Sequence, residues 1–553
     1  MSQLIDFRVD PNNYRHWRVE YDGAIANLFM DVDEDGGLFD GYQLKLNSYD
    51  LGVDIELNDI VQRMRFEHPE VKVVVMRSAK DKVFCAGANI RMLGGAAHSH
   101  KVNFCKFTNE TRNAFEAAEE ESGQKYIAAV KGACAGGGYE LALACNHIML
   151  TDDSQSSVAL PEVPLLAVLP GTGGLTRVTD KRKVRRDLAD IFCATEEGVK
   201  GKRAKDWKLV DDVFKNSVFD EKVVERANEF VAASSKTEVE AGIKLNPLKR
   251  QIDEDGNVAY SCVEVTIDRE GRTATLTLNG PDQPAPETMN EFQALGDQAY
   301  LLRLAREFED AILHLRLNEM DLGLWVIRTQ GDPELLLQHE ALLAQNAEHW
   351  LANEVRHYWK RTLKRVDVTS RSLMAQVEHG SCFAGVLAEL LWAVDRSYMM
   401  EDEFEGDNRP IAKITLSNDN FGTYPMGNGL SRLETRFLDE VEHIEALKAQ
   451  IGEPMEADDA DENGLVTMLL DDIDWEDEIR IFLEERASFS PDAMTGMEAN
   501  LRFAGPETME TRIFGRLTAW QNWIFNRPNA VGEDGALQRY GTGLRGNYNM
   551  ERV

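Results

Sequence analysis

The chain has far fewer positively charged residues than negatively charged ones. Its 553 residues include 61 Lys and Arg against 95 Asp and Glu, which gives a formal net charge of -34. Because a chain this acidic repels phosphate backbones at long range, we expect no general binding of nucleic acid. An anionic ligand would need a local basic patch. The densest one is residues 181–186 (KRKVRR), which we interpret as a solvated helix face rather than as a binding patch.

Cysteines are scarce and do not form a disulfide pattern. The seven are an odd number, none belongs to a C-x-x-C pair, and several lie in apolar runs. This usage is typical of proteins from a reducing compartment. The positions are Cys85, Cys105, Cys134, Cys145, Cys193, Cys262 and Cys382.

Long apolar runs are absent as well. No uninterrupted apolar stretch approaches the ~20 residues of a membrane span, and residues 1–14 are polar and acidic, unlike a signal peptide. We therefore expect a soluble cytoplasmic protein with no membrane partner. A metal site is not expected either. His98 and His100 have the spacing of a ligand pair, but no third ligand is evident, so a polar loop is the favoured interpretation.

The first half of the chain alternates between strand and helix patterns. Residues 19–29 predict a hairpin that turns at Asp22-Gly23. The run 127–144 predicts a strand, a glycine loop and a helix, an order that points helical N–H groups into a site at the end of the strand. Further patterns predict a strand at residues 71–76 and a helix at residues 51–65.

The second half repeats this layout at an offset of about 250 residues. A second predicted hairpin covers residues 263–278, in which Ala274 matches Ala24. Three further matches keep nearly the same offset, which indicates internal duplication. They join Val75-Met76-Arg77-Ser78 to Val326-Ile327-Arg328-Thr329, Glu140 to Glu389, and Leu175-Thr176-Arg177-Val178 to Leu430-Ser431-Arg432-Leu433.

The second copy has lost the glycine motifs of the first. We therefore predict a catalytic half at residues 1–250, a degenerate scaffold half at residues 251–475 and a helical C-terminal segment at residues 476–553 for docking or oligomerisation. An acidic stretch, residues 453–478, is interpreted as the linker into that last segment. Its predicted docking stripe consists of Trp520, Trp523, Ile524 and Phe525.

Three short motifs of the first half carry its chemistry: residues 84–89 (FCAGAN), 135–140 (AGGGYE) and 160–162 (LPE). Glycine lets a backbone N–H approach a ligand without a Cβ in the way. Two such N–H groups can hold an oxygen that gains negative charge, and nearby glutamates can move protons or activate water. This ordered triplet resembles the crotonase (enoyl-CoA hydratase/isomerase) superfamily, whose members bind acyl-CoA thioesters.

The resemblance is closest over residues 19–213. It implies an α/β fold with a crotonase-like ββα spiral core, here internally duplicated with a degenerate second copy and a helical C-terminal segment. It also implies that the backbone N–H groups of Ala88 and Gly137 form the oxyanion hole for the thioester carbonyl. The backbone around Cys85 and Ala86 is implied to contact CoA.

Glu140 and Glu162 match the two carboxylates of the superfamily members that handle water. Taken alone, an acid in the first turn of a helix, as predicted for Glu140, is usually a surface residue that compensates the helix dipole. Glu162 lies in an apolar stretch, residues 158–168, which should raise its pKa and suit it to acid–base work. The presence of both acids favours a reaction with water.

Two further residues, Cys105 and Asn89, bear on the acyl-binding site. Cys105 falls in the helix that lines the acyl pocket in this superfamily, and is interpreted either as a packed small hydrophobic residue or as a thiol that contacts the substrate. Asn89 stands where many hydratases carry aspartate. It can still cap the following helix, but it removes a charge near the acyl site.

The doubled length narrows the resemblance. Together with residues 518–530 (TAWQNWIFNRPNA), it resembles a branch of the superfamily that opens the ring of an epoxidised benzoyl-CoA. A carbon–carbon lyase with an aromatic-ring-derived acyl-CoA substrate is thereby implied, with no further cofactor because the thioester accepts the electrons. An enoyl-CoA hydratase for another acyl-CoA and a non-catalytic CoA-binding assembly protein are the alternatives. We expect a homodimer, since two-fold dimers are the commonest closed oligomers.

Overall fold

The computed structural model of the protein describes residues 4–401 and 406–553. The chain divides into two compact units. One comprises Arg8–Pro247, and the other comprises the residues up to Phe7 together with Leu248–Val553. Within the described ranges, no helix is both long and apolar enough to cross a membrane.

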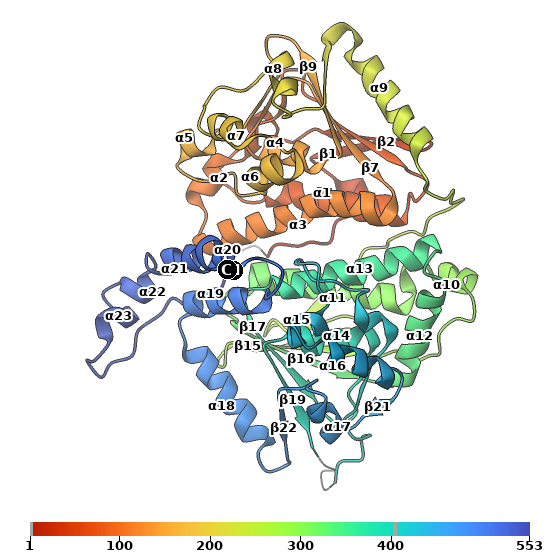
Figure 1. The fold of residues 1–553 in the computed structure, drawn as a ribbon, viewed down its shortest axis with the longest axis vertical. Helices are drawn as coiled ribbons and strands as arrows, with labels where there is room; N and C mark the ends of the chain where they lie inside the picture. Colours follow the sequence, from red (N-terminus) through yellow and green to blue (C-terminus); the bar gives the residue numbers. More distant parts are fainter. Residues whose placement is uncertain (1–3, 402–405) are drawn as a thin grey trace. The chain divides into compact units, whose positions relative to one another are not determined.

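The first unit is built on a six-stranded sheet with the order β1-β2-β4-β7-β9-β11 (Figure 1). β1 and β2 form the predicted antiparallel hairpin, with Gly23 at φ 57° in the turn, and the remaining strands run parallel. The strands are β1 (Trp17–Asp22), β2 (Ile25–Met30), β4 (Val73–Ser78), β7 (Lys125–Val130), β9 (His147–Asp152) and β11 (Asp212–Lys215). The predictions of the hairpin and of the two buried strands are confirmed.

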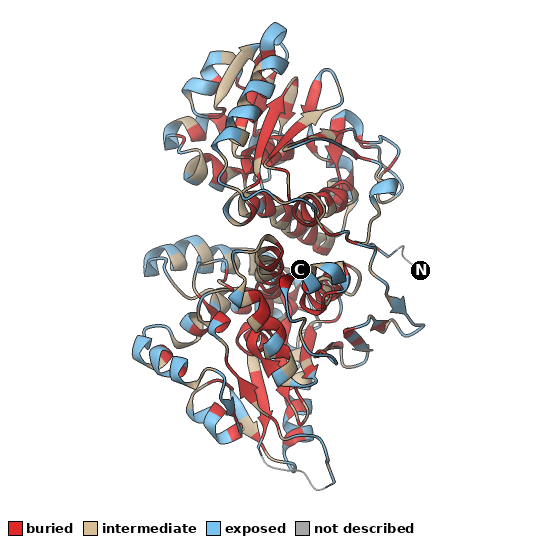
Figure 2. Cartoon of the chain, turned by 90° about the vertical axis from the view of Figure 1, so that its right-hand side faces the viewer, coloured by how far each residue is buried: buried red, intermediate tan, exposed pale blue. Residues whose placement is uncertain are grey.

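Helices cover this sheet because its central strands are apolar on both faces. On one face Val73, Val75 and Ile127 pack against Phe219 and Val223 of α9. The helices of the unit are α1 (Leu51–Phe66), α2 (Ile90–Gly95), α3 (His98–Ser122), α4 (Gly137–Ala144), α5 (Glu162–Leu166), α6 (Gly174–Thr176), α7 (Arg186–Cys193), α8 (Gly201–Asp206) and α9 (Asn216–Ala233). Figure 2 shows the central strands of both sheets buried, whereas exposed residues gather on the outer helices.

A second, smaller sheet of the first unit positions the motif loops. Its three parallel strands are β5 (Val83–Cys85), β8 (Ala133–Ala135) and β10 (Ser157–Ala159), in the order β10-β8-β5. Each of the three sequence motifs therefore lies at the carboxyl end of one of these strands. Directly after β5 in the chain, β6 (Gly87–Ala88) forms a two-stranded parallel pair with β3 (Ser48–Tyr49).

The second unit repeats this architecture, which confirms the internal duplication. Its eight-stranded sheet has the order β12-β13-β14-β15-β16-β17-β19-β22, so that the last six strands reproduce the order of the first sheet. The smaller sheet is β18-β20-β21. The strands are β12 (Gln251–Ile252), β13 (Val258–Ala259), β14 (Val263–Asp268), β15 (Thr273–Asn279), β16 (Leu324–Gln330), β17 (Ser372–Val377), β18 (Phe383–Ala384), β19 (Arg396–Met400), β20 (Ile414–Thr415), β21 (Pro454–Met455) and β22 (Met468–Leu470).

The interpretation of residues 453–478 as a linker is wrong. This stretch contains β21, α17 and β22, and β22 pairs in parallel with β19 at the edge of the large sheet. The helices of the unit are α10 (Met289–Leu295), α11 (Tyr300–Asn318), α12 (Pro333–Gln345), α13 (Trp350–Asp367), α14 (Gly385–Ala393), α15 (Arg432–Phe437), α16 (Val441–Leu447), α17 (Ala457–Glu462), α18 (Trp475–Ser488), α19 (Pro491–Arg502), α20 (Met509–Thr511), α21 (Thr518–Ile524), α22 (Pro528–Val531) and α23 (Ala536–Arg539).

The C-terminal helices are tied to the second unit by buried charges. Glu498 of α19 accepts hydrogen bonds from Ser372 and Arg552, and Arg502 pairs with Asp395 at 2.7 Å. In the predicted docking stripe, Trp520 and Ile524 pack on Gly496 of α19, while Phe525 stays exposed. The stripe is therefore used in part inside the chain itself.

Candidate active site

The two glycine loops of the first unit lie directly against each other. Gly87 has φ 91°, and a Cβ at this position would come within 2.7 Å of the backbone nitrogen of Gly137. At Gly138, a Cβ would come within 2.3 Å of the carbonyl oxygen of Cys85. Real Cβ atoms do not approach backbone so closely, so glycine is required at both positions for the loops to meet.

The contact between the loops brings Ala88 and Gly137 close to each other. Gly137 is the first residue of α4, so its N–H has no acceptor within the helix and lies at the positive end of the helix dipole. Ala88 follows Gly87 directly, and β6 holds it in register with Tyr49 of β3. The structure thus brings together the two residues of the predicted oxyanion hole.

Glu140 is a buried carboxylate that is fixed in place. It lies in the first turn of α4 and is 3% exposed, not on the surface. Its Oε1 accepts hydrogen bonds from the backbone N–H groups of Thr172 at 3.0 Å and Gly174 at 2.8 Å, and the Thr172 hydroxyl donates to Oε2. Burial raises the pKa of Glu140, and these three donors oppose that rise because they stabilise the charged form.

Glu162 is the less constrained of the two acids. It is the first residue of α5, is 8% exposed, and its Oε2 is buried without a hydrogen-bond partner. Its Oε1 would lie 3.0 Å from a Cβ at Gly136, so the carboxylate faces the triple-glycine loop. Burial and then the charge of Glu140 raise the pKa of Glu162 to about 7, as the apolar sequence context predicts.

Cys105 lies on α3 near the segment that holds Glu140. Its Sγ would be 3.9 Å from a Cβ at Gly171, and the side chain is partly buried. Burial, followed by the charges of Glu140 and Asp54, raises the pKa of Cys105 to about 11. The group is therefore a neutral thiol at neutral pH, a state that suits both interpretations of this residue.

The predicted CoA-contacting residues differ in their accessibility. Cys85 is fully buried, and its Sγ donates to the carbonyl oxygen of Asn47 at 3.0 Å, so its side chain is not accessible to a ligand. Ala86 lines a cavity of about 260 Å³ together with Ala88 and two exposed cations, Lys45 and Arg91. Sequence reasoning missed both cations, because the pairing of β3 with β6 brings them together from distant parts of the chain.

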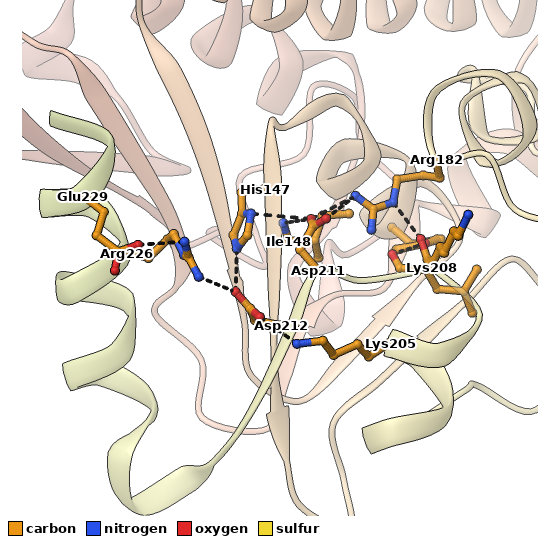
Figure 3. Close-up of polar contacts among 11 residues, drawn as sticks. His147, Ile148, Arg182, Lys205, Lys208, Asp211, Asp212, Arg226 and Glu229 are labelled. Atoms are coloured by element: carbon orange, nitrogen blue, oxygen red, sulfur yellow. Dashed lines mark hydrogen bonds and ion pairs between the residues drawn. The ribbon is translucent and has the colours of Figure 1, made fainter. Parts of the chain in front are cut away.

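The basic run 181–186 is not one helix face. Lys183 has φ 54°, in a turn between two helical segments. Lys181 is bound to Glu116 and to the carbonyl oxygen of Ala144 at the end of α4, both at 2.9 Å. Figure 3 shows Arg182 directed at Asp211, where its Nη1 donates to both carboxylate oxygens at 2.9 and 3.0 Å within a network around His147. The charges of Lys181 and Arg182 therefore stabilise the fold of this unit.

The two histidines predicted to lie in a polar loop belong instead to the first turn of α3, where His100 makes an edge contact with Phe39. Within the described ranges, no group of three or more potential metal ligands occurs. Asn89 caps α2 as predicted, since its side chain accepts a hydrogen bond from the backbone N–H of Met92 at 3.0 Å.

Comparisons with known proteins found a family profile and solved structures that this chain resembles. The profile of the enoyl-CoA hydratase/isomerase family matches residues 43–276. A structure of an enoyl-CoA hydratase from Geobacillus kaustophilus HTA426 is 32% identical over 40% of this chain and 78% of its own, with a TM-score of 0.35. One from Bacillus anthracis is 27% identical over 39% and 77%, with a TM-score of 0.34.

The chain belongs to the enoyl-CoA hydratase/isomerase family, that is, to the crotonases. Within it, a relative matches from end to end. Benzoyl-CoA-dihydrodiol lyase from Aromatoleum evansii is 55% identical over 553 residues, which cover 100% of this chain and 99% of that protein.

Replacing Glu162 by glutamine is expected to stabilise the protein above neutral pH. The folded-state pKa of about 7 lies above that of an ordinary glutamate, so folding binds a proton between these values and stability falls as pH rises through them. Glu162→Gln removes this loss. The free energy of unfolding should rise by at most about 3 kcal/mol at pH 8 and change little at pH 5. Urea unfolding at both pH values measures the difference, with the exposed Glu196→Gln as control. An equal effect at the two pH values would contradict the raised pKa.

Proposed function

We propose that the protein is a carbon–carbon lyase that opens the ring of 2,3-epoxy-2,3-dihydrobenzoyl-CoA in aerobic benzoate degradation through CoA thioesters. The observation that carries this proposal is the end-to-end relationship with a benzoyl-CoA-dihydrodiol lyase, because it includes the second repeat and the C-terminal helices as well as the crotonase unit. The motif loops and both acids are consistent with thioester chemistry that uses water.

The proposed reaction consumes two water molecules and yields 3,4-didehydroadipyl-CoA semialdehyde and formate. The first water opens the ring between carbons 2 and 3 and leaves two aldehyde groups. One of these is attached to the carbon next to the thioester. The second water adds to that aldehyde. The bond between the hydrated aldehyde carbon and the carbon next to the thioester then breaks and releases formate. The electron pair of the broken bond passes into the thioester, so the reaction balances without a redox cofactor.

The oxyanion hole is proposed to lower the barrier of this last step. As the bond breaks, the thioester oxygen becomes an enolate oxygen, which the N–H groups of Ala88 and Gly137 would stabilise. Loss of one such donor typically costs about 3–4 kcal/mol of transition-state binding. The backbone contact at Gly87 and Gly138 holds these donors in place before the substrate arrives.

The two acids are assigned different tasks. Glu162 is proposed as the base that takes a proton from water, because its Oε2 has no partner and its pKa of about 7 lets it gain and lose a proton near neutral pH. Glu140 is proposed to orient the water and the ring oxygens, since three donors already fix its carboxylate. The thiol of Cys105 is proposed to assist the release of formate, and packing alone is the alternative.

The cavity at Ala86 and Ala88 is proposed to receive the CoA part of the substrate. The chain is strongly acidic, so the phosphates of CoA need nearby cations. Lys45 and Arg91 are exposed at this cavity, whereas Lys181 and Arg182 are held by internal carboxylates. Lys45 and Arg91 are therefore the proposed phosphate partners.

The second unit is proposed to be a scaffold. In the repeat, Val386 stands at the position of Gly137, and its N–H donates to Oε2 of Glu340 at 2.6 Å. An internal carboxylate thus occupies the helix terminus that would bind a thioester oxygen. Glu389, the counterpart of Glu140, is bound by Arg432 at 3.0 Å and by Asn420 at 2.8 Å. The second pair of loops therefore has its donors and acids already satisfied.

A homodimer in the cytoplasm is the proposed working form. Large apolar residues of the C-terminal segment remain exposed in the single chain, among them Phe514 at 71%, Leu517 at 50% and Phe525 at 54%. A second copy of the chain would cover this surface. The seven cysteines are all free thiols in the structure, which supports a reducing compartment.

The proposed reaction predicts a clear split between acids of the two units. Purified protein given epoxidised benzoyl-CoA should release formate and the semialdehyde in equal amounts, measured by mass spectrometry and a formate assay. Glu140→Gln and Glu162→Gln should each lower turnover at least ~100-fold while CoA-ester binding stays largely intact. Glu389→Gln, the matched change in the second unit, should leave the turnover of folded protein unchanged.

The two alternative functions give other outcomes of the same experiment. Rapid loss of crotonyl-CoA absorbance with no formate from the epoxide would establish a hydratase for other acyl-CoA substrates. Binding of acyl-CoA without conversion of any of a broad panel would establish a non-catalytic binding protein. Near-normal turnover in both first-unit variants would refute the assigned acids.

Charge reversal at the cavity should weaken substrate binding without slowing chemistry. The double variant Lys45→Glu and Arg91→Glu is expected to raise KM roughly tenfold and to leave kcat within about twofold, because it acts on a part of the substrate far from the reacting bond. Added salt should shrink the difference from wild type. The variant Lys202→Glu with Lys222→Glu has the same net charge and should behave as wild type. A fall in kcat alone would contradict this assignment.

The apolar C-terminal surface predicts the oligomeric state. Light scattering should give the mass of a dimer, and Phe514→Glu with Leu517→Glu should give a monomer, because two charges would have to be buried at the contact. Circular dichroism checks that the variant is folded. A wild-type monomer or trimer, or a variant that remains dimeric, would rule out this interface.

A further inference from the structure

Tyr49 connects the two loops of the candidate oxyanion hole. It is the second residue of β3 and is paired in register with Ala88 of β6. Its carbonyl oxygen accepts a hydrogen bond from the backbone N–H of Asn89 at 2.8 Å. The main chain of Tyr49 is therefore fixed to the first loop on both sides of the Ala88 N–H.

The side chain of Tyr49 reaches the second loop. Its hydroxyl oxygen lies 2.0 Å from the place where a Cβ of Gly137 would be, so the hydroxyl takes the space that glycine leaves free. In a helix the Cα–Cβ bond tilts toward the N-terminus, and the unpaired N–H groups point the same way. The hydroxyl therefore lies on the same side of α4 as the N–H of Gly137.

This hydroxyl has no hydrogen-bond partner in the structure, although Tyr49 is only 1% exposed. Such a group destabilises the free protein unless a ligand supplies the missing partner. Lack of a partner is not sufficient by itself, because the buried hydroxyl of Tyr126 on β7 shares it. What distinguishes Tyr49 is its place at Gly137.

The surroundings keep the Tyr49 hydroxyl protonated and make it a good donor. Burial raises the pKa of Tyr49 well above its usual value, so the phenol does not ionise near neutral pH. The buried guanidinium of Arg112 lies 5.2 Å from the ring centre and is bound to Asp54 at 2.5 Å. The positive charge of Arg112 stabilises the negative charge that develops on the phenol oxygen as the hydroxyl donates, and it therefore favours donation.

We propose that Tyr49 is the third hydrogen-bond donor of the oxyanion hole, and that its hydroxyl binds the thioester oxygen beside the N–H groups of Ala88 and Gly137. This role rests on the proposed thioester function. The hydroxyl donates weakly to the neutral carbonyl and strongly to the enolate oxygen, so it acts on the transition state more than on substrate binding. An aromatic hydroxyl at this point would complement a reaction that expels a carbon fragment and leaves a full enolate.

Tyr49→Phe tests the proposal because it removes only the hydroxyl. The variant should be at least as stable to heat as wild type, since it loses an unpartnered buried group. Its kcat for formation of formate should fall roughly 100-fold, with the dissociation constant for benzoyl-CoA changed less than about threefold. Tyr126→Phe is the matched control and should leave kcat at the wild-type value.

A spectroscopic measurement separates this role from the proposed reaction. Bound benzoyl-CoA with an isotope-labelled carbonyl should show a lower carbonyl stretching frequency on wild type and on Tyr126→Phe than on Tyr49→Phe. Equal frequencies on all three proteins would overturn the role of Tyr49, whatever the reaction. A frequency difference together with no formate from the epoxide would overturn the proposed reaction and leave the donor role standing.

Discussion

The contact between two stretches of bare backbone is the constraint on which the site depends. Gly87 and Gly138 allow main-chain atoms of the two loops to touch, and any side chain there would force them apart. The small parallel sheet makes this contact possible. The three motifs lie at the carboxyl ends of β5, β8 and β10, which are neighbours in that sheet, so residues about 50 and 75 positions apart in the chain meet at one edge. This one arrangement places the candidate N–H donors, and it also places Glu140 and Glu162.

Burial then gives the two carboxylates different properties although they share one site. Glu140 has three donors and can carry its charge with little rearrangement, whereas Glu162 has a buried oxygen with no donor at all. The negative charge of Glu140 further disfavours ionisation of Glu162. A pair with opposed environments divides the tasks of orienting and of transferring a proton. The stability lost through Glu162 is the usual cost of keeping a reactive group ready.

Much of this was predictable from sequence wherever the signal is local. The hairpin at Asp22-Gly23 has a turn dipeptide, and the buried strands are short apolar runs, so both follow from neighbouring residues. Lys45, Arg91 and the donors to Glu140 from Thr172 and Gly174 were not found, because pairing between distant segments brings them together. The prediction of a linker at residues 453–478 is wrong because the many charges of this stretch outweigh the three residues of β22 in the sequence pattern. These three residues form a strand because they pair with β19.

The second repeat shows how the same fold loses the site while keeping its stability. Six strands of its large sheet keep the order of the first unit, so this sheet does not depend on the chemistry of the site. Two of the three loop glycines became Val386 and Leu387, and the remaining Gly385, at φ 47°, lets the carboxylate of Glu340 approach the helix terminus. That carboxylate satisfies the N–H that a substrate oxygen would otherwise need to satisfy. An unpaired donor is useful only where a ligand arrives, and elsewhere the chain gains free energy by pairing it internally. The first unit, with its donors and Glu162 left incomplete, is therefore the one built to bind.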